Sequence, residues 1–282
     1  MRPATLGDEM APRRQHVPWK AAGSASENEH SADAVVRETG WVFNNRGDLS
    51  LADFVKTGDD ESFAYLFNFG LAATPLDSQS LVEVGSGIGR MTASFTRMFE
   101  RVVACDLDAA FLERCRETVA QFGRPDRLHT SHVADGRTLV LPDHSADLVF
   151  SYITLQHCHR VDALALVREA VRVTKPGGHI ALNLRTWVAS DVVLWPAGKL
   201  VRAMWRIPRI GPRLARWRPT ARLGWQANRL SPKQVLPEVA SRLTDIQIFR
   251  SPKRRQFGIS DTADATFDGV HPSHWWLVAT VR

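Results

Sequence analysis

The stretch Leu81-Val-Glu-Val-Gly-Ser-Gly-Ile-Gly-Arg-Met-Thr92 decides the fold of this 282-residue chain. Its apolar start predicts a buried strand, and its glycines at positions 85, 87 and 89 predict a tight turn from that strand into a helix. Glycine adopts backbone conformations closed to other residues and puts no Cβ between the backbone and a ligand. The stretch is therefore typical of a turn that binds a nucleotide-like cofactor at a strand tip.

The spacing of the glycines separates two kinds of cofactor turn. A turn that binds a nicotinamide or flavin dinucleotide has the pattern Gly-x-Gly-x-x-Gly, with a helix N-terminus beneath the pyrophosphate. Here the third glycine comes one residue earlier, and an acidic residue, Glu83, precedes the first glycine by two positions. The spacing therefore favours a cofactor without phosphates.

The pattern resembles motif I of the class I S-adenosylmethionine-dependent methyltransferases, a Glu/Asp-x-Gly-x-Gly-x-Gly turn around the amino-acid end of the cofactor. The resemblance continues in Ser151-Tyr-Ile-Thr-Leu-Gln-His157 and in Leu166-Val-Arg-Glu-Ala-Val-Arg-Val-Thr-Lys-Pro-Gly-Gly178, and it is good from about Ser80 to Leu184. It implies an α/β fold with a doubly wound, Rossmann-like sheet of seven mostly parallel strands and an antiparallel last strand. It also implies S-adenosyl-L-methionine as cofactor and S-adenosyl-L-homocysteine as product.

The sequence after Pro75 alternates strands with helices, which predicts a parallel sheet covered on both faces. We expect strands at residues 81–84, 102–105, 129–133, 148–153, 179–184, 246–249 and 275–281. We expect helices at 90–99, 109–122 and 162–173, and a last one that starts at Ser231-Pro232. The run Lys175-Pro-Gly-Gly178 predicts a tight turn between a helix and a strand.

We divide the chain into five parts. They are a flexible tail (1–33), a helical N-terminal cap (34–75), the methyltransferase core (76–185), a basic, Trp-rich lid inserted in the core (186–230), and a C-terminal helix with the last two strands (231–282). The tail lacks hydrophobic periodicity, and short amphipathic helices broken near Gly47 and Gly58 are expected in the cap.

The resemblance assigns cofactor roles to residues at strand tips, where an open parallel sheet binds its ligands. Asp106 is expected to bind the two ribose hydroxyls, Leu107 to pack on the adenine ring, and Asp135 to accept from the adenine amino group. An ordinary loop aspartate and an Asp-Gly turn are the structural alternatives for these two acids. Glu83 is expected to orient the turn or to reach the cofactor ammonium. The predicted cofactor-binding residues are Glu83, Gly85, Gly87, Gly89, Asp106, Leu107, Asp135, Gly136 and Ser151.

Methyl transfer from a sulfonium is an in-line displacement, so alignment of the reactants in a dry site supplies most of the catalysis. If the acceptor is a hydroxyl, a general base helps to remove its proton, and His157 is the candidate because it lies just beyond the fourth strand. Alternatively, this histidine caps the following helix or orients a loop.

Five further residues are candidates for contact with the acceptor. Tyr152 would line the methyl channel or simply pack, and Arg185 would lie near an anionic or polar acceptor or form a surface ion pair. His271 and His274 lie in the link before the last strand, which returns to the cofactor edge if that strand is antiparallel. Trp225 is the last tryptophan of the Trp-rich lid.

We predict a methyltransferase that acts on a hydroxyl of a sugar, lipid-linked or small natural-product acceptor. The alternatives are carbon or nitrogen methylation of a quinone-like or amine substrate, and a partner subunit that binds S-adenosylmethionine without catalysis. The complete set of predicted cofactor residues argues against the partner subunit. Nucleic acid is not the expected partner, since Ser151-Tyr-Ile-Thr154 differs from the Asn/Asp-Pro-Pro-Tyr of base-amino methyltransferases.

The basic surplus of the chain belongs to one segment. Residues 192–237 hold ten Lys or Arg and no Asp or Glu, whereas the rest of the chain holds 26 basic and 30 acidic residues. Pro208, Gly211 and Pro212 exclude one continuous helix here, so we expect two short ones. Three interpretations stay open: a lid with solvated arginines, a peripheral contact of residues 195–222 with anionic membrane lipid, or a surface for an acidic acceptor.

The sequence lacks the patterns that are typical of a cysteine-based metal site, of a membrane-spanning helix and of a secretory signal. Hydrophobic residues make up 44% of the chain, and the three cysteines show no CxxC pair and no clustered ligand spacing. No window reaches the roughly 18 apolar residues of a membrane-spanning helix, and the start has no basic end followed by an apolar stretch. We therefore expect a cytoplasmic protein, peripheral to the membrane if the lid binds lipid, with reduced cysteines and no metal site.

Overall fold

The computed structural model describes residues 31–39, 49–253, 256–259 and 265–282. Most of the predicted tail lies outside the described residues, as does Gly47, one of the two predicted helix breaks. No helix in the described ranges combines the length and the apolar character that crossing a membrane requires.

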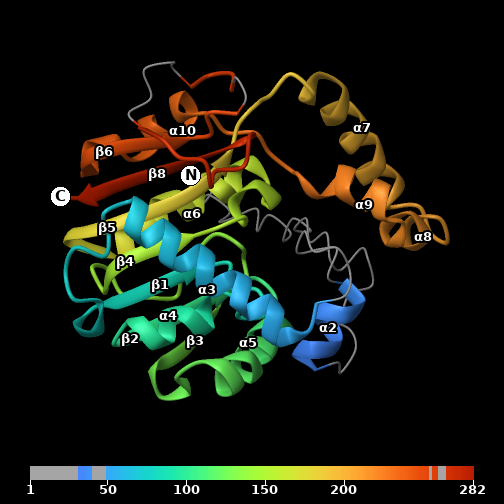
Figure 1. Cartoon of the computed structure of the whole chain (residues 1–282). Helices are drawn as coiled ribbons and strands as arrows, with labels where there is room; N and C mark the ends of the chain where they lie inside the picture. The colour runs from blue at the N-terminus through green and yellow to red at the C-terminus, as the bar shows by residue number, and fades with distance from the viewer. Residues whose placement is uncertain (1–30, 40–48, 254–255, 260–264) are drawn as a thin grey trace, which may run out of the picture.

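One sheet of eight strands forms the centre of the described chain, in the order β3-β2-β1-β4-β5-β8-β6-β7 (Figure 1). The strands are β1 (Ser80–Val84), β2 (Arg101–Asp106), β3 (Leu128–His132), β4 (Ala146–Ser151), β5 (Thr174–Arg185), β6 (Leu243–Arg250), β7 (Ala265–Thr266) and β8 (His274–Val281). Strands β1 to β5 pair in parallel, and β8 is antiparallel to both β5 and β6. The predicted doubly wound sheet with an antiparallel last strand is confirmed.

The number of strands was predicted wrongly as seven. The additional strand, β7, has two residues and pairs in parallel with the end of β6. A two-residue strand is too short to produce an alternating apolar pattern, so the sequence gives no sign of it.

The helices lie in two layers and an arm (Figure 1). They are α2 (Ala32–Thr39), α3 (Leu51–Asn68), α4 (Thr92–Met98), α5 (Ala109–Phe122), α6 (Arg160–Val173), α7 (Asp191–Met204), α8 (Gly211–Arg216), α9 (Arg218–Trp225) and α10 (Pro232–Val239). Single 3₁₀ turns occupy η1 (Leu76–Ser78), η2 (Pro125–Arg127), η3 (Leu155–His157) and η4 (Ala240–Arg242). The expected helix start at Ser231 is a capping box, in which the side chains of Ser231 and Gln234 bind each other's backbone N–H groups.

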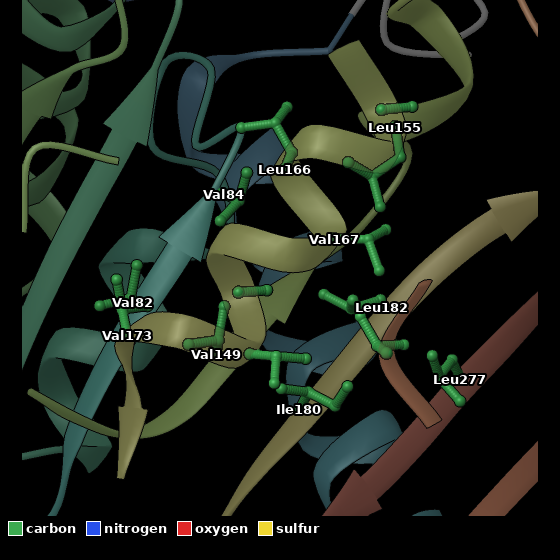
Figure 2. Packing of buried hydrophobic residues seen from close by; sticks show 14 of the residues in the cluster. Val82, Val84, Val149, Leu155, Leu166, Val167, Val173, Ile180, Leu182 and Leu277 are labelled. Atoms are coloured by element: carbon green, nitrogen blue, oxygen red, sulfur yellow. The ribbon is translucent and has the colours of Figure 1, made fainter. Parts of the chain in front are cut away.

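Helices α6 and α10 cover one face of the sheet. Val82, Val149 and Ile180, from neighbouring strands, lie in one buried cluster with Val167 of α6 (Figure 2). These side chains are buried completely or almost completely. Branched aliphatic residues suit such a parallel sheet because both of its faces are buried.

Helices α3, α4 and α5 cover the opposite face. Tyr65 of α3 and Phe69, which caps its C-terminus, join a buried aromatic cluster with Phe150 of β4 and Trp276 of β8. The ring centroids of Tyr65 and Trp276 lie 4.6 Å apart. Helix α3 is therefore fixed on the sheet by aromatic contacts that join the start of the chain to its last strand.

Gly58 does not break a helix, contrary to the prediction. It lies inside α3, where a Cβ would come within 2.2 Å of the backbone oxygen of Arg90. The glycine therefore lets α3 cross the backbone of the glycine turn at close range. Helix α3 therefore packs directly on the backbone at Arg90, just after the glycine turn.

The predicted turn at Lys175–Gly178 is a bulge inside β5 rather than a connection before it. The pairing of β4 with β5 jumps from Ala146 opposite Thr174 to Leu148 opposite His179. The extra residues loop out of the ladder, and Gly177 there has a φ of +80°.

The lid consists of three helices, α7, α8 and α9, rather than the two that were expected. A proline stands in the first turn of α8 and another in the first turn of α9. Proline at this position starts a helix because its missing N–H has no acceptor there. The prolines therefore divide the segment into more helices than a count of helix breakers suggests.

Candidate active site

A cavity of about 220 Å³ lies at the carboxyl ends of β1 and β4, where the strand order reverses. Such a volume holds a small molecule rather than one ordered water. The predicted site residues that line it are Glu83, Gly85, Gly87, Asp106, Leu107, Gly136, Tyr152, His157 and Trp225. The fold therefore brings most of the predicted residues to one place.

The glycine turn forms the floor of this cavity, and all three of its glycines have positive φ angles. A Cβ on Gly85 would lie 2.1 Å from the Thr154 hydroxyl, and one on Gly89 would lie 3.1 Å from the Cα of Cys115 in α5. A Cβ on Gly87 would meet no atom within 4 Å. Two glycines therefore allow close packing of the protein, and the third leaves open space beside the cavity.

Asp106 ends β2 beside the turn. Its carboxylate accepts hydrogen bonds from the backbone N–H groups of Gly87 and Asp108, at 2.8 and 2.9 Å. Burial raises the pKa of Asp106 to about 6 in spite of these bonds. The backbone N–H of Leu107 also interacts with this carboxylate. A carboxylate offers about four acceptor sites, so acceptor capacity remains for a hydroxyl group of a ligand.

Glu83 lies inside β1 at the base of the cavity. It is buried and accepts a hydrogen bond of 2.5 Å from the Thr92 hydroxyl. Burial raises the pKa of Glu83 to about 7, while the hydrogen bond and the nearby Arg90 lower it. This carboxyl group is therefore ready to change its charge when a cation binds next to it.

Three predicted cofactor residues do not line the cavity. The carboxylate of Asp135 accepts from the backbone N–H groups of Arg137 and Thr138, at 2.8 and 2.9 Å, and from the Thr138 hydroxyl. Ser151 is fully buried and donates to the carbonyl of Val84. Gly89 packs on α5. The geometry of Asp135 is that of the Asp-Gly turn, the structural alternative, and its adenine role stays a prediction.

His157, at the end of η3, lines the cavity between the sheet and the lid. Its Nδ1 donates to the carbonyl of Trp225 at the end of α9, at 2.9 Å. A carbonyl only accepts, so Nδ1 carries the hydrogen and Nε2 of the neutral ring keeps its lone pair. Burial lowers the pKa of His157 to about 4. The ring is therefore neutral at pH 7.

Tyr152 also lines the cavity, as one side of the aromatic cluster. Its ring stacks on Trp276 with a centroid distance of 5.5 Å and an angle of 6° between the planes. The guanidinium of Arg90 lies 5.7 Å from its centroid. Arg90 is held in turn by Glu61 of α3, at 2.6 Å. Tyr152 is thus both a packing residue and a surface of the cavity.

Arg185 lies outside the cavity, in a buried group of charges at the base of the lid. Its guanidinium donates to Asp191 at 2.7 Å, and Arg229 donates to the same oxygen at 2.8 Å. Asp191 is fully buried, and these two arginines hold its pKa below the usual range although burial raises it. The structure thus favours an ion pair for Arg185, although a buried one rather than the expected surface pair.

His271 and His274 also lie outside the cavity. Their ring centroids are 4.8 Å apart, and His271 contacts the Ser273 hydroxyl. Burial lowers the pKa of His274 well below its usual value, and His271 and Arg185 add to the effect. The antiparallel β8 does bring this link to the carboxyl edge of the sheet, where His274 pairs with Arg185 at the end of β5. Neither histidine, however, lines the cavity.

Several cavity residues carry no sequence signal of their own. Phe54 of α3, Phe111 of α5 and Cys158 line the cavity beside residues of the motif. Ser86 and Arg90 are different, because they lie inside the glycine stretch and its spacing could have identified them. Within the described ranges, no group of three His, Cys, Asp or Glu side chains could hold a metal ion.

Comparison with known families identifies the segment that builds the cavity. Residues 82–182 match the family model described as "Methyltransferase domain". The segment is a class I S-adenosylmethionine-dependent methyltransferase domain. The predicted family is thus confirmed, and S-adenosyl-L-methionine is its cofactor.

The chain is also similar to curated proteins. Carboxy-S-adenosyl-L-methionine synthase of Pseudomonas putida is 29% identical over 158 residues, which are 54% of this chain and 64% of that protein. Malonyl-acyl-carrier-protein O-methyltransferase of Marinomonas sp. is 33% identical over 118 residues, which are 40% of this chain and 41% of that protein. The chain therefore spans less than two thirds of these relatives.

Among solved structures, the chain is similar to the N-methyltransferase NodS from Bradyrhizobium japonicum in complex with S-adenosyl-L-homocysteine. The identity is 12%, the match covers 79% of this chain and 86% of that one, and the TM-score is 0.47.

The cavity of the methyltransferase domain fits a cofactor without phosphates. The open space beside Gly87 admits a ligand against the backbone, and Asp106 has free acceptor sites next to it. Among the described residues that line the cavity, Arg90 is the one Lys or Arg, and Glu61 and Thr57 bind its guanidinium. The charges thus suit hydroxyl and ammonium groups better than a pyrophosphate.

Proposed function

We propose that the protein transfers a methyl group from S-adenosyl-L-methionine to a hydroxyl of a sugar, lipid-linked or small natural-product acceptor, with His157 as general base. The hydrogen bond from its Nδ1 to the carbonyl of Trp225 carries this proposal. This bond fixes the tautomer, so that the basic nitrogen is the one left for a ligand.

The pKa of His157 determines the form in which the ring meets the acceptor. Burial lowers it to about 4, so the ring is unprotonated over the physiological range and needs no prior loss of a proton. With the cofactor bound, an acceptor hydroxyl would give its proton to Nε2 of His157 while its oxygen takes the methyl group and the bond from that group to the sulfonium sulfur breaks. S-adenosyl-L-homocysteine would leave as the other product, and solvent would remove the proton from His157. The carbonyl of Trp225 stabilises the imidazolium in this step, because it already accepts from Nδ1.

The remaining cavity residues bind and orient. When bound, the cofactor supplies an electrophilic methyl group on its sulfonium. Asp106 would accept from the ribose hydroxyls, and Glu83 would interact with the ammonium group. Trp225 and Tyr152 exclude water from the space beside His157, which strengthens the alignment of acceptor and methyl carbon.

One relative supports oxygen as the accepting atom. The malonyl-acyl-carrier-protein O-methyltransferase of Marinomonas sp. is similar to 40% of this chain by sequence. The basic nitrogen of His157 has a clear use in O-methylation, whereas a neutral amine acceptor already has the lone pair that attacks.

The test uses two substitutions at one position. His157→Asn keeps an N–H group that can donate to the Trp225 carbonyl but has no basic nitrogen, whereas His157→Ala lacks both. Transfer of labelled methyl to fractionated cell extracts measures turnover. If His157 is the base, both variants lose roughly 10²–10⁴-fold in rate and still bind S-adenosyl-L-homocysteine in calorimetry. Recovery of the rate in His157→Asn alone would show that the residue only positions the lid.

A further inference from the structure

The solvent face of α7 is apolar, which is the reverse of the usual pattern for a helix on a soluble protein. Val192, Val193 and Leu200 are 72%, 71% and 62% exposed. Pro196 and Ala203 are exposed on the same side, since the spacing of these five residues puts them within about a third of the helix circumference. A continuous apolar strip therefore runs along this helix.

The opposite side of α7 is the one that packs on the protein. A Cβ on Gly198 would lie 2.5 Å from the carbonyl of Leu223 in α9, and Arg202 donates to the carbonyls of Gly224 and Gln226. Asp191 fixes the start of the helix through Arg185 and Arg229. The helix already has its packing partner, and its apolar strip faces away from that partner.

The segment that follows α7 also exposes large apolar side chains, with cations among them. Ile207, Ile210 and Trp217 are 44%, 52% and 61% exposed. Of the thirteen large apolar side chains exposed in the described residues, seven lie between positions 192 and 217. The exposed cations among them are Lys199, Arg206, Arg209 and Arg213.

No acidic side chain of the lid can neutralise these cations. Residues 192–237 contain no Asp or Glu, and Asp191, just before them, is fully buried between two arginines. Figure 1 shows α7, α8 and α9 as an arm apart from the two helix layers of the core. The exposed surface of this arm therefore combines apolar residues with an uncompensated positive charge.

We propose that the outer face of α7 and α8, with Trp217, docks on an anionic lipid bilayer. Its apolar residues enter the boundary between headgroups and acyl chains, and its arginines bind the lipid phosphates. The Lys199 side chain is long enough to reach the headgroups from inside the strip. An anionic bilayer is the partner that satisfies both properties at once, because it offers apolar depth beneath a negative surface. The docking does not depend on the proposed acceptor or on His157.

Flotation of the full-length protein with vesicles tests this docking. We expect binding to phosphatidylcholine vesicles that contain about 30% phosphatidylglycerol, and little binding to phosphatidylcholine alone. Arg206→Ala/Arg209→Ala/Arg213→Ala is expected to weaken partitioning about a hundredfold, and Val193→Glu/Leu200→Glu about tenfold or more. Salt at about 1 M should weaken binding of the wild type because it screens the lipid charge.

Each variant has a control with the same change of net charge elsewhere on the surface. Arg101→Ala/Arg160→Ala/Arg282→Ala removes three exposed arginines outside the arm, and Phe67→Glu/Val140→Glu places two acids on exposed apolar positions outside it. Both controls should float as the wild type does. Equal loss of binding in a control and its partner would overturn the proposal, since general charge would then explain the binding.

Two further results would overturn the proposal. One is failure of the wild type to bind anionic vesicles. The other is a dimer in light scattering that Val193→Glu/Leu200→Glu dissociates, because a second copy would then cover the strip. Thermal melting checks that every variant is folded, and the substituted side chains are exposed, so melting temperatures should stay near that of the wild type.

Discussion

The cavity has two walls that are held in place by different means. The first, which we name the cofactor wall, is the glycine turn at 85–89 with Glu83 and Asp106. The second, the lid wall, is His157 with Trp225. In the cofactor wall, backbone N–H groups bind a carboxylate, and glycines allow close contacts between neighbouring loops. In the lid wall, hydrogen bonds join distant parts of the chain: His157 donates to the carbonyl of Trp225, and the Asn228 side chain donates to the carbonyls of Leu155 and Cys158.

The two walls also differ in the interactions that fix them to the rest of the protein. The lid is fixed to the core by Asp191, which binds Arg229 across 38 positions of sequence and Arg185 across 6. Backbone geometry within one strand, turn and helix holds the first wall, whereas long-range hydrogen bonds and a group of buried charges hold the second. A substitution should therefore damage one wall and leave the other nearly intact.

Replacing Asp191 should give the largest effect. In Asp191→Asn, two buried guanidinium groups lose their carboxylate, and breaking a buried ion pair in this way costs about 3–5 kcal/mol of stability. The loss should fall on the lid, where α7 begins. Hydrogen exchange should show faster exchange in α7–α9 and unchanged protection in β1 and β2, and calorimetry should show retained binding of S-adenosyl-L-homocysteine.

The control for this variant is Asp126→Asn, which removes an exposed carboxylate paired with Arg124 at 3.1 Å. Exposed pairs contribute little to stability, so exchange should stay as in the wild type. If the two variants have the same exchange in α7–α9, the buried charges do not hold the lid.

A substitution in the glycine turn should break the cofactor wall instead. In Gly85→Ala, the new Cβ meets the Thr154 side chain, and the φ of +84° strains any residue other than glycine. Together these effects cost roughly 2–4 kcal/mol. We expect a lower melting temperature and no measurable binding of S-adenosyl-L-homocysteine in calorimetry.

Gly70→Ala separates backbone strain from the close contact. Gly70 has a similar φ of +69°, but a Cβ there would meet nothing within 4 Å. This variant should lose only about 1 kcal/mol from strain and keep its affinity for the cofactor product. Equal losses in the two variants would mean that strain alone, and not the contact with Thr154, shapes the turn.

The same contrast explains what the sequence could predict. The glycine turn and Asp106 depend on backbone conformations within one strand, turn and helix, so spacing along the chain was sufficient. The doubly wound, mostly parallel sheet and its antiparallel last strand followed from the family resemblance. Asp135 shows the limit of this approach, because a turn residue and a ligand-binding residue have the same local sequence.

The lid could not be predicted in this way. Arg185 stands at a strand tip, as a substrate-binding residue would, and its partners become visible only when Asp191 and Arg229 are brought together by the fold. The apolar spacing of α7 is that of a buried helix face, yet the packed side is the one that contains Gly198. Periodicity tells which residues share a face, and tertiary structure alone decides which face is covered.

The smallest effect is expected at Glu83, where a buried carboxylate lowers the stability of the fold and is proposed to bind the cofactor. Burial raises the pKa of Glu83 to about 7 from an ordinary value of 4.5, so the folded protein binds a proton there more tightly than the unfolded chain does. Stability is therefore lost as the pH rises from about 4.5 through 7, and the full loss is present at pH 8. Glu83→Gln cannot ionise and can still accept from Thr92. We expect it to be about 1–3 kcal/mol more stable than the wild type at pH 8, with the gain shrinking toward pH 5.

Denaturant unfolding at several pH values measures this difference, and Glu100→Gln, at an exposed glutamate, should show none of it. Asp106, whose pKa burial raises to about 6, keeps a weaker pH dependence of the same sign in both proteins. The gain in stability should be accompanied by a loss of about tenfold in affinity for S-adenosyl-L-homocysteine, because the ammonium group loses its charged partner. A variant that is less stable than the wild type at pH 8 would mean that Glu83 stabilises the cofactor wall as a carboxylate, and that this wall, like the lid, depends on a buried charge.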